Sequence, residues 1–185
     1  MMKRHLFKKL ALLAFSTVLL GASNTLATDT IKLGAMEPLS GNFKDIGERY
    51  LEGVNYAAEV INANGGLLGR KVEIVAVDSE LKPDIATRKA TKLILKDNVK
   101  FFCGGTGSSV GGAMSALLEK HNGIFFTFGM DAANMTGSSC SRHFFRPGGS
   151  TDGRSYALAQ LVVKNGYKKV ATIVQVGNAP IQAQC

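Results

Sequence analysis

Residues 101–111 read Phe-Phe-Cys-Gly-Gly-Thr-Gly-Ser-Ser-Val-Gly, an apolar run that passes through a glycine-rich loop into a helical pattern. The segment Val99–Cys103 has the composition of a short buried strand. After the loop, between Ser108 and His121, apolar residues recur at helical spacing, at Val110, Met114, Leu117 and Leu118. A strand that enters a helix directly through glycines is typical of a parallel α/β sheet.

Strands and helices alternate in the same way upstream of this stretch. Strands are expected at Ile31–Met36 and Val72–Asp78, which are short, apolar and bounded by turn residues. Pro83 is expected to open a helix after the second strand. The apolar positions of the two upstream helices are spaced three or four residues apart: Ile46, Tyr50, Val54, Ala57 and Ile61 in the first, and Ala86, Ala90, Leu93 and Ile94 in the second.

The alternation continues downstream. A strand is expected at Ile124–Phe128, an extended segment at His143–Arg146, a helix containing Tyr156–Val163, and a last strand at Lys169–Val174. The strands are short and apolar throughout, as expected where both faces of a sheet are covered. The predicted fold class is therefore α/β, with a parallel sheet and helices on both faces.

Residues 1–27 have the layout of a secretory signal peptide. A basic segment, Met1–Lys9, precedes an uncharged apolar run, Leu10–Leu20, and small residues follow it. The run is too short for a transmembrane helix, which needs about 20 apolar residues. This segment is therefore predicted to direct export to the periplasm, with cleavage between Ala27 and Thr28.

The charge of the chain gives little support to nucleic-acid binding. There are 22 basic and 14 acidic residues, a net charge of +8. The predicted signal peptide holds Lys3, Arg4, Lys8 and Lys9 and no acidic residue, so its removal halves the net charge. Because the remaining excess is small and not gathered in one motif, no nucleic-acid partner is expected.

The cysteines do not follow the spacing of a zinc site, and no pair of histidines has metal-binding spacing. No metal site is therefore expected. Two states remain open for Cys103: a buried free thiol, or a disulfide with Cys140, which an oxidising compartment would permit. The state of Cys185 is equally open.

Three loops are expected at the carboxyl ends of the strands, where parallel sheets bind ligands: residues 37–47, 104–109 and 129–136. The loop Gly104–Ser109 leads into a helix, whose first N–H groups are unpaired and carry a partial positive charge. With two serine hydroxyls, this loop suits a small anion such as a carboxylate. The alternative is that Ser108 or Ser109 only caps the helix.

Enzymatic alternatives find weaker support in the same loop. A dinucleotide loop would need glycine where Val110 stands, and no phosphate-loop motif is present. Residues 107–111 fit Gly-x-Ser-x-Gly, the pattern of a nucleophile elbow with Ser109 as the nucleophile. Such an enzyme would also need His121 or His143 as a base. No enzymatic activity and no cofactor are expected.

Several segments, in order along the chain, match one known family. They are Ile31–Gly41 (Ile-Lys-Leu-Gly-Ala-Met-Glu-Pro-Leu-Ser-Gly), Ile61–Gly69 (Ile-Asn-Ala-Asn-Gly-Gly-Leu-Leu-Gly), Lys71–Asp78, Gly105–Ser109 and the pair Phe145-Arg146. Through them, residues 30–175 resemble the periplasmic solute-binding proteins of ABC importers, in the branched-chain amino-acid (Leu/Ile/Val) group.

The resemblance implies two α/β lobes that close on a small ligand around a hinge. Residues 28–147 then form an N-terminal ligand-binding lobe of the type I periplasmic binding protein fold, and residues 148–185 begin a second lobe. The implied function is an extracytoplasmic solute-binding component of an ABC importer. Its implied partners are a small amino acid, or a related amide or carboxylate, and the permease subunits of the inner membrane.

The resemblance also implies the site residues. The ligand carboxylate is expected on Gly105, Thr106, Ser108 and Ser109, with Ser109 as the principal donor. The next loop normally reads Pro-x-Ala-Thr, but here Met130 and Asp131 stand in it. Asp131 would either pair with a ligand ammonium group or cap the following turn. Ile46 occupies a position that often carries an aromatic contact. These departures leave amides, urea-like solutes and aromatic acids open as ligands.

The expected second lobe is incomplete. Family members are about twice as long, and residues 177–185 show no periodicity and replace the usual continuation. The chain is therefore expected to be truncated, which leaves the apolar side of the helix at 156–163 with little to pack against. The alternatives are a gene remnant without function and a ligand sensor of the same fold.

Export provides the first test. N-terminal sequencing of the periplasmic form is expected to begin at Thr28, because the apolar run is bounded by charge before it and by small residues after it. A full-length protein fixed in the membrane would contradict this prediction.

Overall fold

The computed structural model describes residues 30–171. The predicted signal peptide, the atypical tail at 177–185 and Cys185 lie outside the described residues. So does most of the strand predicted at 169–174, and its described part, residues 169–171, is not a strand. Within the described range, no helix has the length and apolar character needed to cross a membrane.

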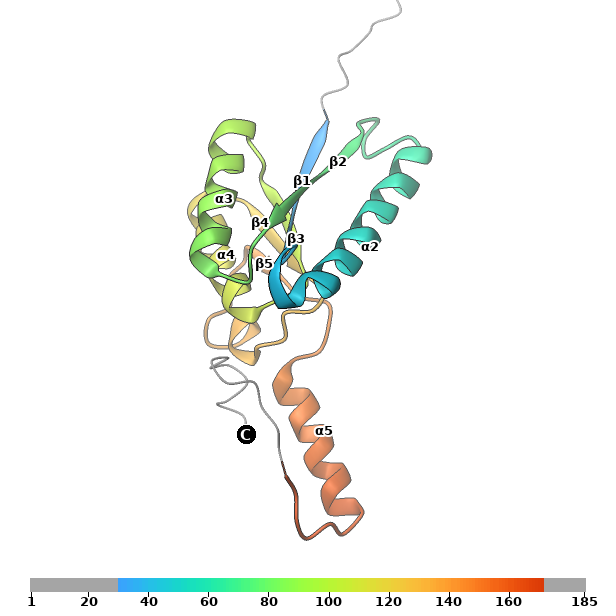
Figure 1. Ribbon diagram of the computed structural model, residues 1–185, viewed down its shortest axis with the longest axis vertical. Coiled ribbons are helices and arrows are strands. Elements are labelled where there is room, and N and C mark those ends of the chain that lie inside the picture. Colours follow the sequence, from blue (N-terminus) through green and yellow to red (C-terminus); the bar gives the residue numbers. More distant parts are fainter. Residues whose placement is uncertain (1–29, 172–185) are drawn as a thin grey trace, which may run out of the picture.

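Five parallel strands form one sheet in the order β2-β1-β3-β4-β5 (Figure 1). The strands are β1 (Ile31–Glu37), β2 (Val72–Asp78), β3 (Phe101–Gly104), β4 (Ile124–Thr127) and β5 (Phe144–Phe145). The helices are α2 (Lys44–Ala63), α3 (Pro83–Asp97), α4 (Ser108–Lys120) and α5 (Thr151–Lys164), with the short 3₁₀ helices η1 (Gly41–Phe43) and η2 (Ala133–Thr136). The predicted α/β class with a parallel sheet is confirmed.

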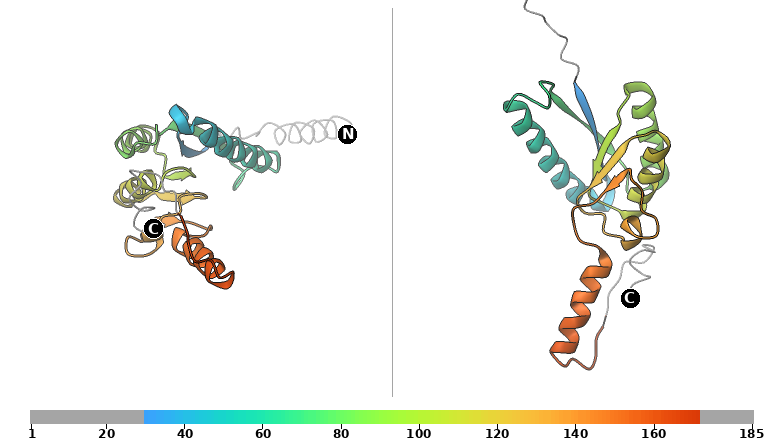
Figure 2. Two further views of the ribbon diagram at one scale, coloured as in Figure 1. Left: turned by 60° about the horizontal axis from the view of Figure 1, so that its bottom comes forward. Right: turned by 180° about the vertical axis from the view of Figure 1, so that it is seen from behind.

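The strand order places α2 on one face of the sheet and α3 and α4 on the other (Figures 1 and 2). The chain moves outward from β1 to β2 through α2, then returns past β1 to β3 through α3. Because crossovers between parallel strands are right-handed, this reversal puts the two helices on opposite faces. The strand order therefore reverses between β1 and β3.

The core lies on the α3–α4 face. Phe102, Phe125 and Phe144 are register partners across β3, β4 and β5, and all three are buried. The predicted apolar positions of α3 and α4 pack against them, and among these Ala86, Ala90, Ile94, Val110, Met114 and Leu118 are fully buried, while Leu93 and Leu117 are partly buried. The spacing of apolar residues therefore identified the inner sides of both helices.

The other face is covered unequally. The residues adjacent in sequence to the core row, Phe101, Phe126 and Phe145, point to this face and are each nearly half exposed. Among the described elements only α2 packs here, and Asn62 ties it to β2 through two 2.8 Å hydrogen bonds with the backbone N–H and carbonyl of Val72. Helices do cover both faces, as predicted, but α2 leaves β4 and β5 largely bare.

The last helix, α5, extends away from the sheet (Figure 1). None of its residues is buried, and Tyr156, Leu158, Leu161 and Val163 are exposed. The expected lack of packing partners for this helix is thus borne out in the described part of the chain.

The alternation of faces along β3 predicts different costs for two neighbouring phenylalanines. Phe102→Ala should lower the free energy of unfolding by about 3–5 kcal/mol, because it removes a ring that is 1% exposed and leaves a cavity. Phe101→Ala, the matched control at 48% exposure, should cost about 1 kcal/mol or less. Urea denaturation of both variants measures this, and equal costs would contradict the assignment of faces.

Candidate ligand-binding site

The three predicted loops meet at the carboxyl edge of the sheet, where the strand order reverses between β1 and β3. Two hydrogen bonds join them. The backbone N–H of Gly105 donates to Glu37 Oε1 at 2.5 Å, which links β1 to the glycine-rich loop. The backbone N–H of Ala132 donates to Ser108 Oγ at 3.2 Å, which links that loop to the loop after β4.

The start of α4 remains chemically open. Its N-cap is Gly107, with φ 88°, and no side chain caps it. The proposal that a serine only caps the helix is therefore wrong: Ser108 binds Ala132 instead, and Ser109 is exposed and makes no hydrogen bond through its hydroxyl to the residues that the structure describes. Within residues 30–171 the first N–H groups of α4 therefore have no partner and are available to an anion.

Two aromatic rings close the inner side of the glycine-rich loop. Tyr50 of α2 and Phe128, just after β4, are in contact, with ring centroids 4.9 Å apart. Both rings lie against Gly105, so a side chain at that position would collide with them. Tyr50 was identified in the sequence only as part of a helix face, and Phe128 only as part of a strand. Their meeting at Gly105 depends on how α2 packs on the sheet.

Glu37 is a buried acidic group at this edge and is not among the site residues predicted from the sequence. Burial raises the pKa of its carboxyl to about 7, against the opposing effect of Thr106 and of the Gly105 N–H. The second oxygen, Oε2, and the hydroxyl of Thr106 are both buried without a partner in hydrogen-bonding geometry. The acidic residue at the end of an apolar strand was the available signal for this group.

The loop after β4 is held by two arginines. Asp131 forms an ion pair with Arg154 of α5 at 2.5 Å, and the Asp131 carbonyl accepts from the Thr151 N–H at 2.8 Å. Arg146 donates to the carbonyls of Met130 and Ala132 at 3.3 and 2.8 Å, and to the Thr136 hydroxyl.

The structure excludes one of the two roles predicted for Asp131, that of a cap. Asp131 does not cap the following turn, because the N-cap of η2 is Ala132 and no side chain caps it.

The Met130 side chain is packed in the core, so only its backbone faces the loop. Ile46 lies in the first turn of α2 and is 47% exposed. The structure therefore brings the glycine-rich loop beside the loop after β4: the predicted residues that come together are Gly105, Thr106, Ser108, Ser109, Met130 and Asp131. Among the described residues, no hydrogen bond joins Ile46 to this group.

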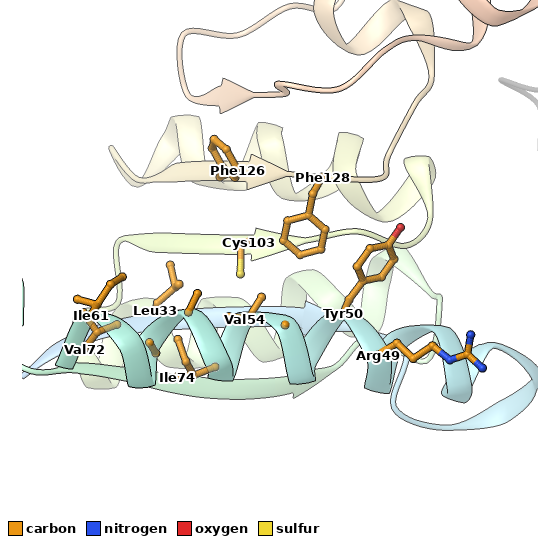
Figure 3. A pocket seen from close by; sticks show the side chains of 13 residues that line it. Leu33, Arg49, Tyr50, Val54, Ile61, Val72, Ile74, Cys103, Phe126 and Phe128 are labelled. Carbon is orange, nitrogen blue, oxygen red and sulfur yellow. The ribbon is translucent and has the colours of Figure 1, made fainter. Parts of the chain in front are cut away.

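A separate apolar groove of about 520 Å³ lies between α2 and the sheet (Figure 3). Leu33, Val54, Ile61, Cys103 and Phe126 are among its lining residues, and it shares no residue with the predicted site. Tyr50 and Phe128 line one end of it, so these two rings separate the groove from the glycine-rich loop.

The histidines of the described chain are placed wrongly for a serine hydrolase. His121 follows the last turn of α4, whereas Ser109 stands in the first. The Nδ1 atom of His143 lies 2.7 Å from the carbonyl of Gly123, before the start of β4. Both are therefore at the opposite edge of the sheet from Ser109, and neither can take its proton.

The cysteine pairing is also settled for the described residues. Cys103 is buried beneath α2, whereas Cys140 is exposed beside α4 on the other side of the sheet, and both are free thiols. The predicted alternative of a disulfide between Cys103 and Cys140 is therefore wrong. Within residues 30–171, no group of three or more His, Cys, Asp or Glu side chains could hold a metal ion.

Comparison with known proteins assigns the family. The sequence profile of the periplasmic binding proteins matches residues 30–184. The chain belongs to this family. The match spans the strands, the glycine-rich loop and the segment that includes α5, so the resemblance noted in the sequence is confirmed.

Two curated relatives have names that refer to amino-acid binding. An amino acid binding protein of Pseudomonas aeruginosa is 31% identical over 93% of this chain and 46% of its own length. A Leu/Ile/Val-binding protein homologue of Brucella abortus is 29% identical over 86% of this chain and 39% of its own length. The chain thus spans less than half the length of the curated relatives it matches.

Solved structures agree with the fold. The substrate-binding protein of an amino-acid ABC transporter from Pseudomonas fluorescens superposes with a TM-score of 0.73 at 25% identity, over 84% of this chain and 42% of its own. A solute-binding protein from Rhodopseudomonas palustris, solved with benzoate, gives 0.72 at 25% identity, over 84% and 45%. The type I periplasmic binding protein fold predicted from the sequence is confirmed.

The buried carboxyl of Glu37 predicts how stability changes with pH. Its folded pKa of about 7 exceeds the ordinary value of 4.5, so the folded state binds the proton more tightly. This stabilisation is complete below about pH 4.5 and is lost as pH rises through 7. Between pH 5 and 8 the free energy of unfolding should fall by about 2–3 kcal/mol. Urea denaturation should show this slope in the wild type and lose most of it in Glu37→Gln, whereas Glu73→Gln, on the exposed side of β2, should retain it.

Proposed function

We propose that this chain supplies the N-terminal ligand-binding lobe of an extracytoplasmic solute-binding component of an ABC importer. In this proposal, residues 28–147 form that lobe and residues 148–185 begin the second. The ligand is a small amino acid, or a related amide or carboxylate, bound between two lobes. Family membership supports this role, and the likeness to ABC transporter proteins from Pseudomonas fluorescens and Rhodopseudomonas palustris supports the importer.

The observation that carries the ligand assignment is the uncapped start of α4. Its free N–H groups and the exposed Ser109 hydroxyl face outward at the carboxyl edge of the sheet, next to the Gly105–Gly107 backbone. Helix N-termini favour anions because the dipole and the unpaired donors act together. A carboxylate is the group shared by amino acids and by the benzoate of the Rhodopseudomonas protein.

The loop after β4 contains Asp131, the residue predicted to pair with the ammonium group of an amino-acid ligand. Asp131 is the acidic side chain among the predicted ligand contacts, and it is already paired with Arg154. An ammonium group would therefore have to compete with that ion pair for Asp131. Within the proposed class, ligands whose recognition depends on the carboxylate, including aromatic acids, need no such competition.

Location and partners follow from the same role. We infer export to the periplasm through residues 1–27, with cleavage at Ala27–Thr28, and docking on permease subunits of the inner membrane. The role needs no cofactor and no nucleic acid. The family is one of binding proteins, and the placement of His121 and His143 removes the base that Ser109 would need as a nucleophile.

Ser109 provides the test of the ligand site. In a chimera that carries the complete second lobe of a full-length relative, Ser109→Ala should weaken binding of a carboxylate ligand by roughly 1.5–3 kcal/mol, the contribution of a hydrogen bond to a charged group. Calorimetry with leucine, benzoate and acetamide measures this. Ser139→Ala, a serine exposed elsewhere in the lobe, serves as the control. Unchanged affinity in Ser109→Ala would remove this residue from the site.

A further inference from the structure

Glu37 combines deep burial with a position at the edge where the ligand loop begins. It is the last residue of β1 and is 1% exposed. Asp78 of β2 is its register partner, and the charge of Glu37 acts on the thiol of Cys103 in β3, which is in register with Ala35. A carboxyl group at such a site loses its hydration, so it is retained only where protein groups replace water.

The replacement group is the first peptide of the glycine-rich loop. Glu37 Oε1 accepts the Gly105 N–H at 2.5 Å, a contact between residues 68 positions apart in the chain. Gly105 is buried, and Thr106 and Gly107 then lead directly into α4. The orientation of the Gly105 peptide therefore sets the path of the backbone into the helix start that carries the free N–H groups.

We propose that Glu37 is a positioning residue for the loop Gly105–Ser109: its buried carboxyl group fixes the Gly105 peptide and thereby orients the N–H groups of the α4 start. This role deepens the proposed carboxylate site and rests on it for its biological meaning. The physical linkage between Glu37 and the loop, however, stands independently of any ligand.

A second observation points to the same loop. Glu37 Oε2 and Thr106 Oγ1 are both buried, and neither has a partner in hydrogen-bonding geometry within residues 30–171, although the Thr106 hydroxyl lies close enough to Glu37 to act on its pKa. When the carboxyl is protonated, its O–H supplies the donor that the ionised form lacks at Oε2. When it is ionised, the buried charge is better solvated in water, so opening of the loop becomes more favourable.

Cys103 and Asp78, two titratable groups near Glu37, have pKa values that are shifted away from neutral pH. The pKa of the Cys103 thiol is raised to about 12, first by burial and then by the charge of Glu37. The pKa of Asp78 is lowered: burial acts to raise it, but hydrogen bonds from the N–H groups of Glu80 and Leu39, with the nearby Lys89, outweigh that effect. Tyr50 covers Gly105 through its ring. A transition near pH 7 at this loop would therefore report Glu37.

The test is amide hydrogen exchange of the full chain by NMR, without ligand, at pH values from 5 to 8 and corrected for intrinsic exchange rates. In the wild type, the protection of Gly105, Thr106 and Ser108 should fall at least tenfold over this range and level off above pH 7. In Glu37→Gln, which keeps the acceptor but cannot ionise, protection of these amides should be independent of pH. Glu73→Gln is the matched control and should behave as the wild type.

Glu37→Ala separates positioning from general stability. It leaves the Gly105 N–H buried without an acceptor, so exchange of the loop amides should rise at least tenfold while amides of α3 change little. The proposal is overturned if Glu37→Gln keeps the wild-type pH profile, if Glu37→Ala raises exchange equally in α3 and the loop, or if the wild-type loop shows no protection. If Glu37→Ala does not fold, the Gln variant still decides. Failure of ligand binding in the Ser109 chimera would leave every one of these outcomes unaffected.

Discussion

The packing of Phe102 against β1 is the contact on which the rest of the lobe depends. Its ring lies over Gly34, where any side chain would collide with it, and it is in register with Phe125 on the other side. Because Phe102 is thereby fixed between β1 and β4, the helices α3 and α4 can both seat on the row of phenylalanines. This contact also aligns β3 with β1, and the point where the strand order reverses follows from that alignment.

The arrangement of the loops at the carboxyl edge depends on this alignment through a short series of contacts. With β1 and β3 in register, Glu37 reaches Gly105 across the sheet, and Ser108 reaches the loop after β4. The helix start at α4 is then held from both sides by groups that do not cap it. The helix can therefore keep its N-terminal donors available for an anion, which a serine cap would have occupied.

The two faces of the sheet differ in what completes them. One face is sealed by α3 and α4, while the other exposes Phe101, Phe126 and Phe145 beside a groove under α2. The apolar side of α5 is exposed as well.

The sequence by itself determined the kind and order of the elements. The patterns that predicted them are local, because each is formed by residues close together in the sequence. They are the helical spacing in α3 and α4, the short apolar runs in the strands and the loop at 104–109. For this reason the parallel sheet, the buried sides of the helices and the position of that loop between β3 and α4 were predictable. The family resemblance added the type I fold, because its segments occur in order along the chain.

Only the tertiary structure decided which side chains meet. Glu37 is hydrogen-bonded to Gly105, 68 residues away, and Asp131 is paired with Arg154 of a helix that the periodicity alone could not place. Met130 turned into the core, and Cys103 and Cys140 came to lie on opposite sides of the sheet. These outcomes depend on strand register and helix packing, which no short stretch of sequence encodes, because the contacts that fix them join residues far apart in the chain.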